Sequence, residues 1–100
     1  MVGRTLRWSK RAENSLTKIL AYYRDRNESS EYSDKLSREI HNALERVVAN
    51  PYMGHRQGKG DFRFVIVYPF QVFYRVTKKE IRVSLVWDAR RNPDTLKLTR

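Results

Sequence analysis

The second half of the chain contains three runs in which apolar and polar residues alternate, at residues 62–68, 71–76 and 81–88. Because successive side chains of a β-strand point to opposite sides of a sheet, this alternation predicts three strands with one apolar and one polar side. The side chains predicted to share the polar side are Arg63, Gln71, Arg75 and Arg82, and those predicted to form the core are Val72, Tyr74, Ile81, Val83 and Leu85. A small sheet that turns cations outward suggests a polyanionic target.

The charge of the chain is concentrated in the same half. The formal net charge is +10 and the pI is near 10.3. Residues 1–50 carry 10 basic and 7 acidic side chains, whereas residues 51–100 carry 11 basic and 4 acidic ones. A basic surface raises the rate of encounter with nucleic acid, anionic lipid or acidic protein segments, and charge alone leaves these three partners open.

The length of 100 residues fits a single domain, 1–100, with one core. The chain has no cysteine, and its two histidines, His41 and His55, stand apart from paired carboxylates. We therefore expect no disulfide, no metal site and no cofactor. No run has the length of a signal-peptide core or of a membrane span, so the sequence predicts a cytoplasmic protein without a membrane partner.

The first half of the chain predicts one strand and two amphipathic helices. Residues 2–8 are typical of a short strand, and Ser9 is a suitable N-cap for the helix that follows. A polar run at residues 25–30 separates the helices, and Asn50-Pro51 ends the second one. The apolar stripes are Ala12, Leu16, Ile19, Leu20 and Tyr23 in the first helix, and Tyr32, Leu36, Ile40, Ala43, Leu44, Val47 and Val48 in the second.

These elements together predict a two-layer α+β fold. The order is an N-terminal strand, a helical hairpin and a three-stranded antiparallel meander, with the hairpin covering one side of the sheet. A flexible basic loop, residues 51–60, connects the hairpin to the meander. Trp87 is in phase with Val83 and Leu85, so it is predicted to lie in the same core or at its edge.

Several short motifs stand at the junctions of these elements. They are Trp8-Ser9 before the first helix, Asn50-Pro51 with Gly54 before the sheet, and the runs 70–76 and 85–93. With the order of elements, they resemble the RelE/ParE toxin superfamily over nearly the whole chain. The run 70–76 is similar to the central strand of that family, and the run 85–93 is similar to its closing strand and arginine-rich tail.

The resemblance implies a toxin of a bacterial type II toxin–antitoxin pair, neutralised by a cognate antitoxin that wraps a disordered segment around it. It also implies one of two targets. RelE-like members cut mRNA on the ribosome, whereas ParE-like members inhibit DNA gyrase.

The two branches place different demands on the residues of this chain. Cleavage of RNA by its 2′-hydroxyl needs a base, an acid and cations around one phosphate. Through the resemblance, Arg63 matches a basic position of the first meander strand and Arg90 matches a phosphate-stabilising arginine after the last one. The tail after Trp87 contains neither tyrosine nor histidine. His55 is the remaining candidate acid, and the pattern favours a ParE-like toxin.

Two further surfaces are predicted from the pattern of charges. A target-binding or nucleic-acid-binding patch is expected at one end of the sheet, where loop and tail converge, and it consists of Arg56, Lys59, Arg63, Arg90 and Arg91. An antitoxin-binding surface is expected around an exposed Phe73, with Arg75 and Arg82 beside it. Asp88 is expected to pair with Arg90 or Arg91, or to cap a turn. Ordinary solvated arginines are the alternative for each of these positions.

Two other classes of function remain open on the sequence. A small RNA- or DNA-binding module without toxicity would need only the charge and the sheet, although no base-stacking motif typical of such modules is present. A toxin relic would still bind its antitoxin but harm nothing.

Overall fold

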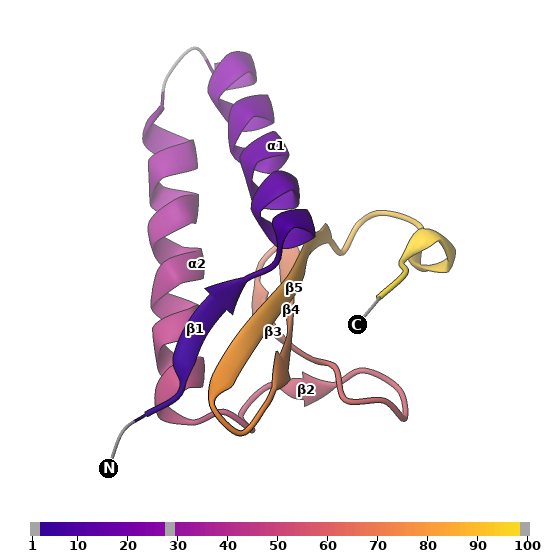
Figure 1. Cartoon of the computed structure of the whole chain (residues 1–100). Helices are drawn as coiled ribbons and strands as arrows, with labels where there is room; N and C mark the ends of the chain where they lie inside the picture. The colour runs from indigo at the N-terminus through magenta and orange to yellow at the C-terminus, as the bar shows by residue number, and fades with distance from the viewer. Residues whose placement is uncertain (1–2, 28–29, 99–100) are drawn as a thin grey trace.

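The computed structural model describes residues 3–27 and 30–98. It contains two helices, α1 (Lys10–Asn27) and α2 (Glu31–Ala49), and five strands. The strands are β1 (Thr5–Trp8), β2 (His55–Arg56), β3 (Arg63–Val67), β4 (Phe70–Val76) and β5 (Glu80–Asp88). A short 3-10 turn, η1 (Pro93–Thr95), lies in the C-terminal tail. The predicted α+β order is confirmed (Figure 1).

The strands form one sheet in the order β1-β5-β4-β3-β2. The last three long strands make the predicted antiparallel meander, and β1 pairs in parallel with β5 at the edge. The strand predicted at residues 2–8 is observed from Thr5, and Val2 lies outside the described residues. The predicted loop at residues 51–60 contains one additional element, since β2 pairs with β3 through His55 and Arg56.

Both helices begin where the sequence predicts, and α2 also ends there, whereas α1 continues to Asn27, into the polar run that was predicted to end it. The Ser9 hydroxyl accepts a hydrogen bond from the amide of Ala12 at 3.0 Å, which satisfies one of the free N–H groups at the start of α1. Asn50 is the C-cap of α2. Within the described ranges, no helix combines the length and hydrophobicity that a membrane crossing requires.

The main core lies between the helices and one side of the sheet, here called the helix side. Leu36, Ile40 and Leu44 of α2 pack there against strand residues such as Val72 and Ile81, and all five are at most 2% exposed. The predicted stripes supply this core with one exception. Tyr32 is 37% exposed and rests on the Tyr23 ring with centroids 4.9 Å apart.

A change of register divides β5 into two parts. Val83 pairs with Tyr74 and Leu85 pairs with Phe73, so Ser84 is an extra residue between two consecutive positions of β4. Such a bulge places two residues opposite one and reverses the alternation beyond it. Leu85 and Trp87 therefore leave the helix side. Both are buried, as predicted, but the prediction that they share a side with Val83 is wrong.

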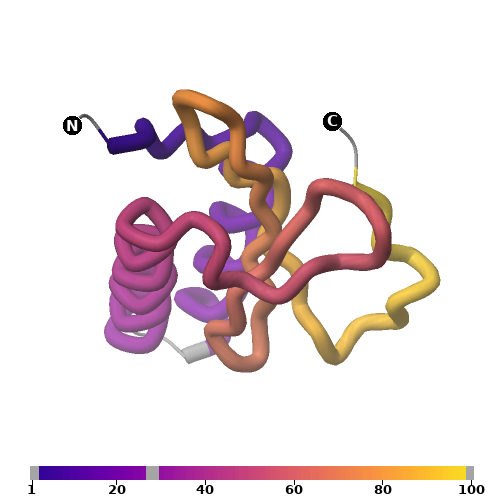
Figure 2. Tube along the Cα trace, turned by 90° about the horizontal axis from the view of Figure 1, so that it is seen from below, coloured from indigo at the N-terminus to yellow at the C-terminus, as the bar shows by residue number. Residues whose placement is uncertain are grey.

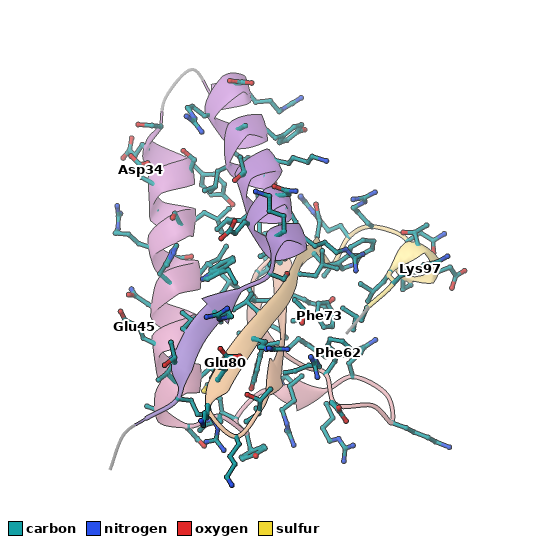
Figure 3. The ribbon with its side chains drawn as sticks, in the orientation of Figure 1. Asp34, Glu45, Phe62, Phe73, Glu80 and Lys97 are labelled. Carbon is teal, nitrogen blue, oxygen red and sulfur yellow. The ribbon has the colours of Figure 1, made fainter. Side chains whose placement is uncertain are left out.

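A second apolar cluster lies on the opposite side of the sheet, here called the far side. Its members, the tail cluster, are Phe73, Leu85 and Trp87, covered by Phe64, Leu96 and Leu98. Phe73 is 0% exposed, so the prediction that its ring is exposed is wrong. Helix α2 and the C-terminal tail lie on opposite sides of the strands (Figure 2), and Phe73 points to the side that carries the tail (Figure 3). The tail thus shields an apolar patch that the helices do not cover.

Candidate functional site

An exposed tyrosine between two arginines marks the end of the sheet next to the loop after α2. The Tyr52 side chain is 58% exposed. The guanidinium carbon of Arg63 lies 5.2 Å from the centre of its ring, and that of Arg4 lies 5.9 Å away. Both distances are within the range of a cation–π contact. We call Arg4, Tyr52, Arg56 and Arg63 the loop-end site.

A pocket of about 300 Å³ opens within the loop-end site. Arg56 and Arg63 line it together with Tyr52, and Asp61 adds one carboxylate. Arg56 and Arg63 are directly opposite each other in the β2–β3 pair, and opposed residues lie on the same side of a sheet. The pocket therefore combines an aromatic wall with two cations.

Two side chains, Tyr74 and Arg63, hold the loop in this position. The hydroxyl of Tyr74 donates to the carbonyl of Pro51 at 2.8 Å and accepts from the amide of Gly54 at 2.9 Å. A Cβ on Gly54 would lie 2.9 Å from the Phe64 carbonyl oxygen and would collide with the Tyr74 hydroxyl, so only glycine fits. Burial raises the pKa of Tyr74, which keeps the hydroxyl protonated.

The second side chain that holds the loop is Arg63. Its Nη1 donates to the carbonyls of Tyr52 and Gly54 at 3.2 and 3.0 Å. Arg63 pairs directly with Tyr74, which belongs to the main core, so Arg63 lies on the helix side. The prediction that it shares one side with Gln71, Arg75 and Arg82 is wrong.

His55 occupies the opposite side of the same strand pair. It pairs with Phe64, and the two rings lie 5.3 Å apart. Phe64 belongs to the far side because it covers Phe73. His55 and Arg63 therefore point to opposite sides of the sheet.

The two arginines of the tail lie at the other end of the strands. Asp88 pairs with Phe70, four residues along β4 from the partner of Arg63, which corresponds to roughly 13 Å of strand. Arg90 donates to both carboxylate oxygens of Asp88, at 2.9 and 2.8 Å, and to the Tyr23 hydroxyl at 3.0 Å. The hydrogen bond from Arg90 lowers the pKa of Asp88 and favours the ionised pair.

The predicted convergence of loop and tail cations is therefore not formed. Arg56 and Arg63 share one pocket, and Lys59 is exposed in the loop beside them. Arg90 and Arg91 lie apart from them, and Arg91 rests over the Trp87 ring at 5.0 Å. The predicted pairing of Asp88 with Arg90 is confirmed.

Arg75 and Arg82 lie on the far side, directly opposite each other. Arg7 of β1 pairs with Arg82, so three arginines stand in one row across neighbouring strands. Sequence reasoning missed Arg7, although the alternation in residues 5–8 places it on the side opposite Leu6 and Trp8. It also missed Arg4 and Tyr52, which come together only through the parallel pairing of β1 at the sheet edge.

The fold of this chain is a known one. It is shared with a solved chain described as "Chromosomal ParDE TA system from P. aeruginosa", with a TM-score of 0.70 and 23% sequence identity over 83% of this chain and 92% of that one. Among curated proteins, no sequence match is found.

The sequence model of one family matches most of the chain, at residues 6–93. That family is described as "ParE toxin of type II toxin-antitoxin system, parDE". This chain belongs to the ParE toxin family. The resemblance inferred from the sequence motifs is thereby confirmed, and family membership assigns the chain the role of a toxin.

Proposed function

We propose that this chain is a growth-inhibiting toxin that acts on DNA gyrase in the cytoplasm, without cutting RNA, and that a cognate antitoxin neutralises it. Membership of the ParE family supports a toxin of this branch. The observation that carries the proposal against RNA cleavage is the separation of Arg63, His55 and Arg90, the three candidates for nuclease chemistry.

RNA cleavage requires those groups to act on one phosphate. A general acid or base must be within about 3 Å of the atom that it serves. His55 and Arg63 point to opposite sides of the sheet, and Arg90 lies at the other end of β4, bonded to Asp88 and Tyr23. The three side chains are thus held apart by the strand pairing itself.

The loop-end site is the surface that we assign to the target. Its cations and exposed tyrosine ring suit an anionic surface, such as DNA held by gyrase, because arginines bind phosphates and a ring stacks on bases. Inhibition of gyrase in this way requires the site to bind its target and does not require it to break a bond. A non-toxic nucleic-acid module shares this chemistry, but family membership favours the toxin.

Two measurements on the same protein test the proposal. Purified chain should inhibit the supercoiling of relaxed plasmid by gyrase, and transcripts from cells that briefly express it should stay intact in primer extension. Arg56→Gln and Tyr52→Leu should weaken the inhibition about tenfold each, as expected for the loss of a phosphate or stacking contact. Arg38→Gln, an exposed change on α2, is the matched control.

New 5′ ends inside translated frames, with unaffected gyrase, would overturn the proposal in favour of a ribosome-dependent nuclease. Growth without arrest, despite a folded chain that binds its antitoxin, would identify a toxin relic.

A further inference from the structure

A row of arginines crosses three neighbouring strands on the far side of the sheet. Arg7, Arg82 and Arg75 are register partners on β1, β5 and β4. Adjacent strands are about 4.8 Å apart, so the row spans roughly 10 Å. Three like charges in one row repel one another, and such an arrangement is typical of a surface that receives anions.

A pocket of about 240 Å³ adjoins this row where β1 runs into α1. Arg7, Arg75 and Arg82 line it, and Arg11 adds a fourth guanidinium from the first turn of α1. The Trp8 side chain points to the helix side, where it packs on the main core. We call the four arginines the arginine pocket.

One carboxylate of the chain already binds this row. Glu80 accepts from Arg7 Nε and from Arg82 Nε, each at 2.9 Å, through its two oxygens. The hydrogen bond from Arg82 lowers the pKa of Glu80, so its carboxylate is ionised at neutral pH. The spacing of these two arginines thus accommodates a carboxylate.

The other two arginines have donors to spare. Arg75 lies over the Phe62 ring at 5.8 Å, and Arg11 donates to the backbone carbonyl of Lys97. A guanidinium carries five N–H donors, and these contacts occupy few of them. A second carboxylate can therefore bind between them without breaking the Glu80 pair.

We infer that the arginine pocket binds an extended acidic segment of a protein partner, with carboxylates at alternate positions. Alternate residues of an extended chain are about 6.6 Å apart, which fits within the row. The carboxylate that already lies between Arg7 and Arg82 favours a peptide over a phosphate backbone. Naming the antitoxin as this partner rests on the proposed function, whereas the binding site itself does not.

The test is calorimetric titration of the full chain with a blocked peptide of alternating glutamate and valine. We expect saturable binding, and no binding of the same peptide with glutamine in place of glutamate. Arg75→Gln should weaken binding about tenfold, because a charge-assisted hydrogen bond is lost. Arg38→Gln should leave it unchanged. Glu80→Gln should strengthen binding, because it frees Arg7 and Arg82 for a further carboxylate of the peptide.

Three results would overturn the inference. The first is absence of binding to a folded chain, and the second is binding that ignores both Arg75→Gln and Arg82→Gln. The third is binding of a single-stranded oligonucleotide that depends on these arginines while the peptide does not bind, which would make the pocket a nucleic-acid site. None of these results bears on the inhibition of gyrase, so failure here and failure of the proposed function are separable.

Discussion

The two sides of the sheet are built on different principles. On the helix side, Val72, Tyr74, Ile81 and Val83 are all fully buried beneath α1 and α2. On the far side, an apolar end covered by the tail adjoins the arginine row. The comparison of the two sides shows that the side of a sheet opposite its helices can still be partly buried.

The bulge at Ser84 separates the two halves of the far side. Before it, β5 presents Arg82 to the far side; after it, β5 presents Leu85 and Trp87. A one-residue insertion reverses which side chains face the core. The same strand thus supplies a binding surface at one end and a small second core at the other.

The largest effect is expected from Phe73→Asp, which would break the apolar half of the far side. The substitution removes a fully buried ring and places a carboxylate among Leu85 and Trp87. We expect a loss of more than about 4 kcal/mol in the free energy of unfolding, from lost burial and uncompensated charge. Denaturant unfolding followed by circular dichroism measures it.

Ile66→Asp is the matched control, because Ile66 lies on the same side but is 57% exposed. Its cost should stay below about 1 kcal/mol. A folded Phe73→Asp chain of near-normal stability would show that the ring is accessible, and would return Phe73 to the antitoxin-binding surface.

A smaller effect distinguishes the two apolar regions from each other. Leu44 of α2 is 0% exposed in the main core, whereas Leu96 of the tail is only partly buried. We expect Leu44→Ala to cost about 3 kcal/mol and Leu96→Ala about 1 kcal/mol, in proportion to the contacts and area lost. Both are read from denaturant midpoints at equal slope. Equal costs would mean that the tail is as integral to the fold as the helices.

Much of the fold follows from local pattern. The stripes of α1 and α2, the Ser9 cap and the stop at Asn50-Pro51 depend on neighbouring residues and are legible in the sequence. The bulge is different, because Ser84 has no feature that distinguishes it from an ordinary polar strand residue. Its position depends on which pairing buries more apolar surface, and that requires Phe73, Leu96 and Leu98 to be placed together.

The sequence predicted which basic residues belong to the candidate site but not which of them lie together. Basic residues were expected in the loop, and Arg56 and Arg63 do share a pocket. Their separation from Arg90 depends on strand register, which the alternation does not fix. Tyr52 has no partner near it in the sequence that would mark it, because Arg4 comes from the N-terminal part of the chain.

The smallest effect concerns the ionic half of the far side. The pKa of Glu80 is lowered by its hydrogen bond with Arg82 and by the charge of Arg7, and an unfolded glutamate titrates near about 4.3. A lowered pKa in the folded chain means that this stabilisation is fully present above the unfolded pKa and is lost as the pH falls through the folded pKa.

Surface ion pairs contribute little, so Glu80→Gln should lower the denaturant midpoint only slightly at neutral pH. The difference from the unsubstituted chain should shrink as the pH falls below about 4.3 and vanish below the lowered pKa of the folded chain. An Arg7→Gln, Arg82→Gln background should abolish it at every pH. A difference that persists in acid would mean that Glu80 stabilises the fold by packing, and the far side would then resemble the helix side more than its charges suggest.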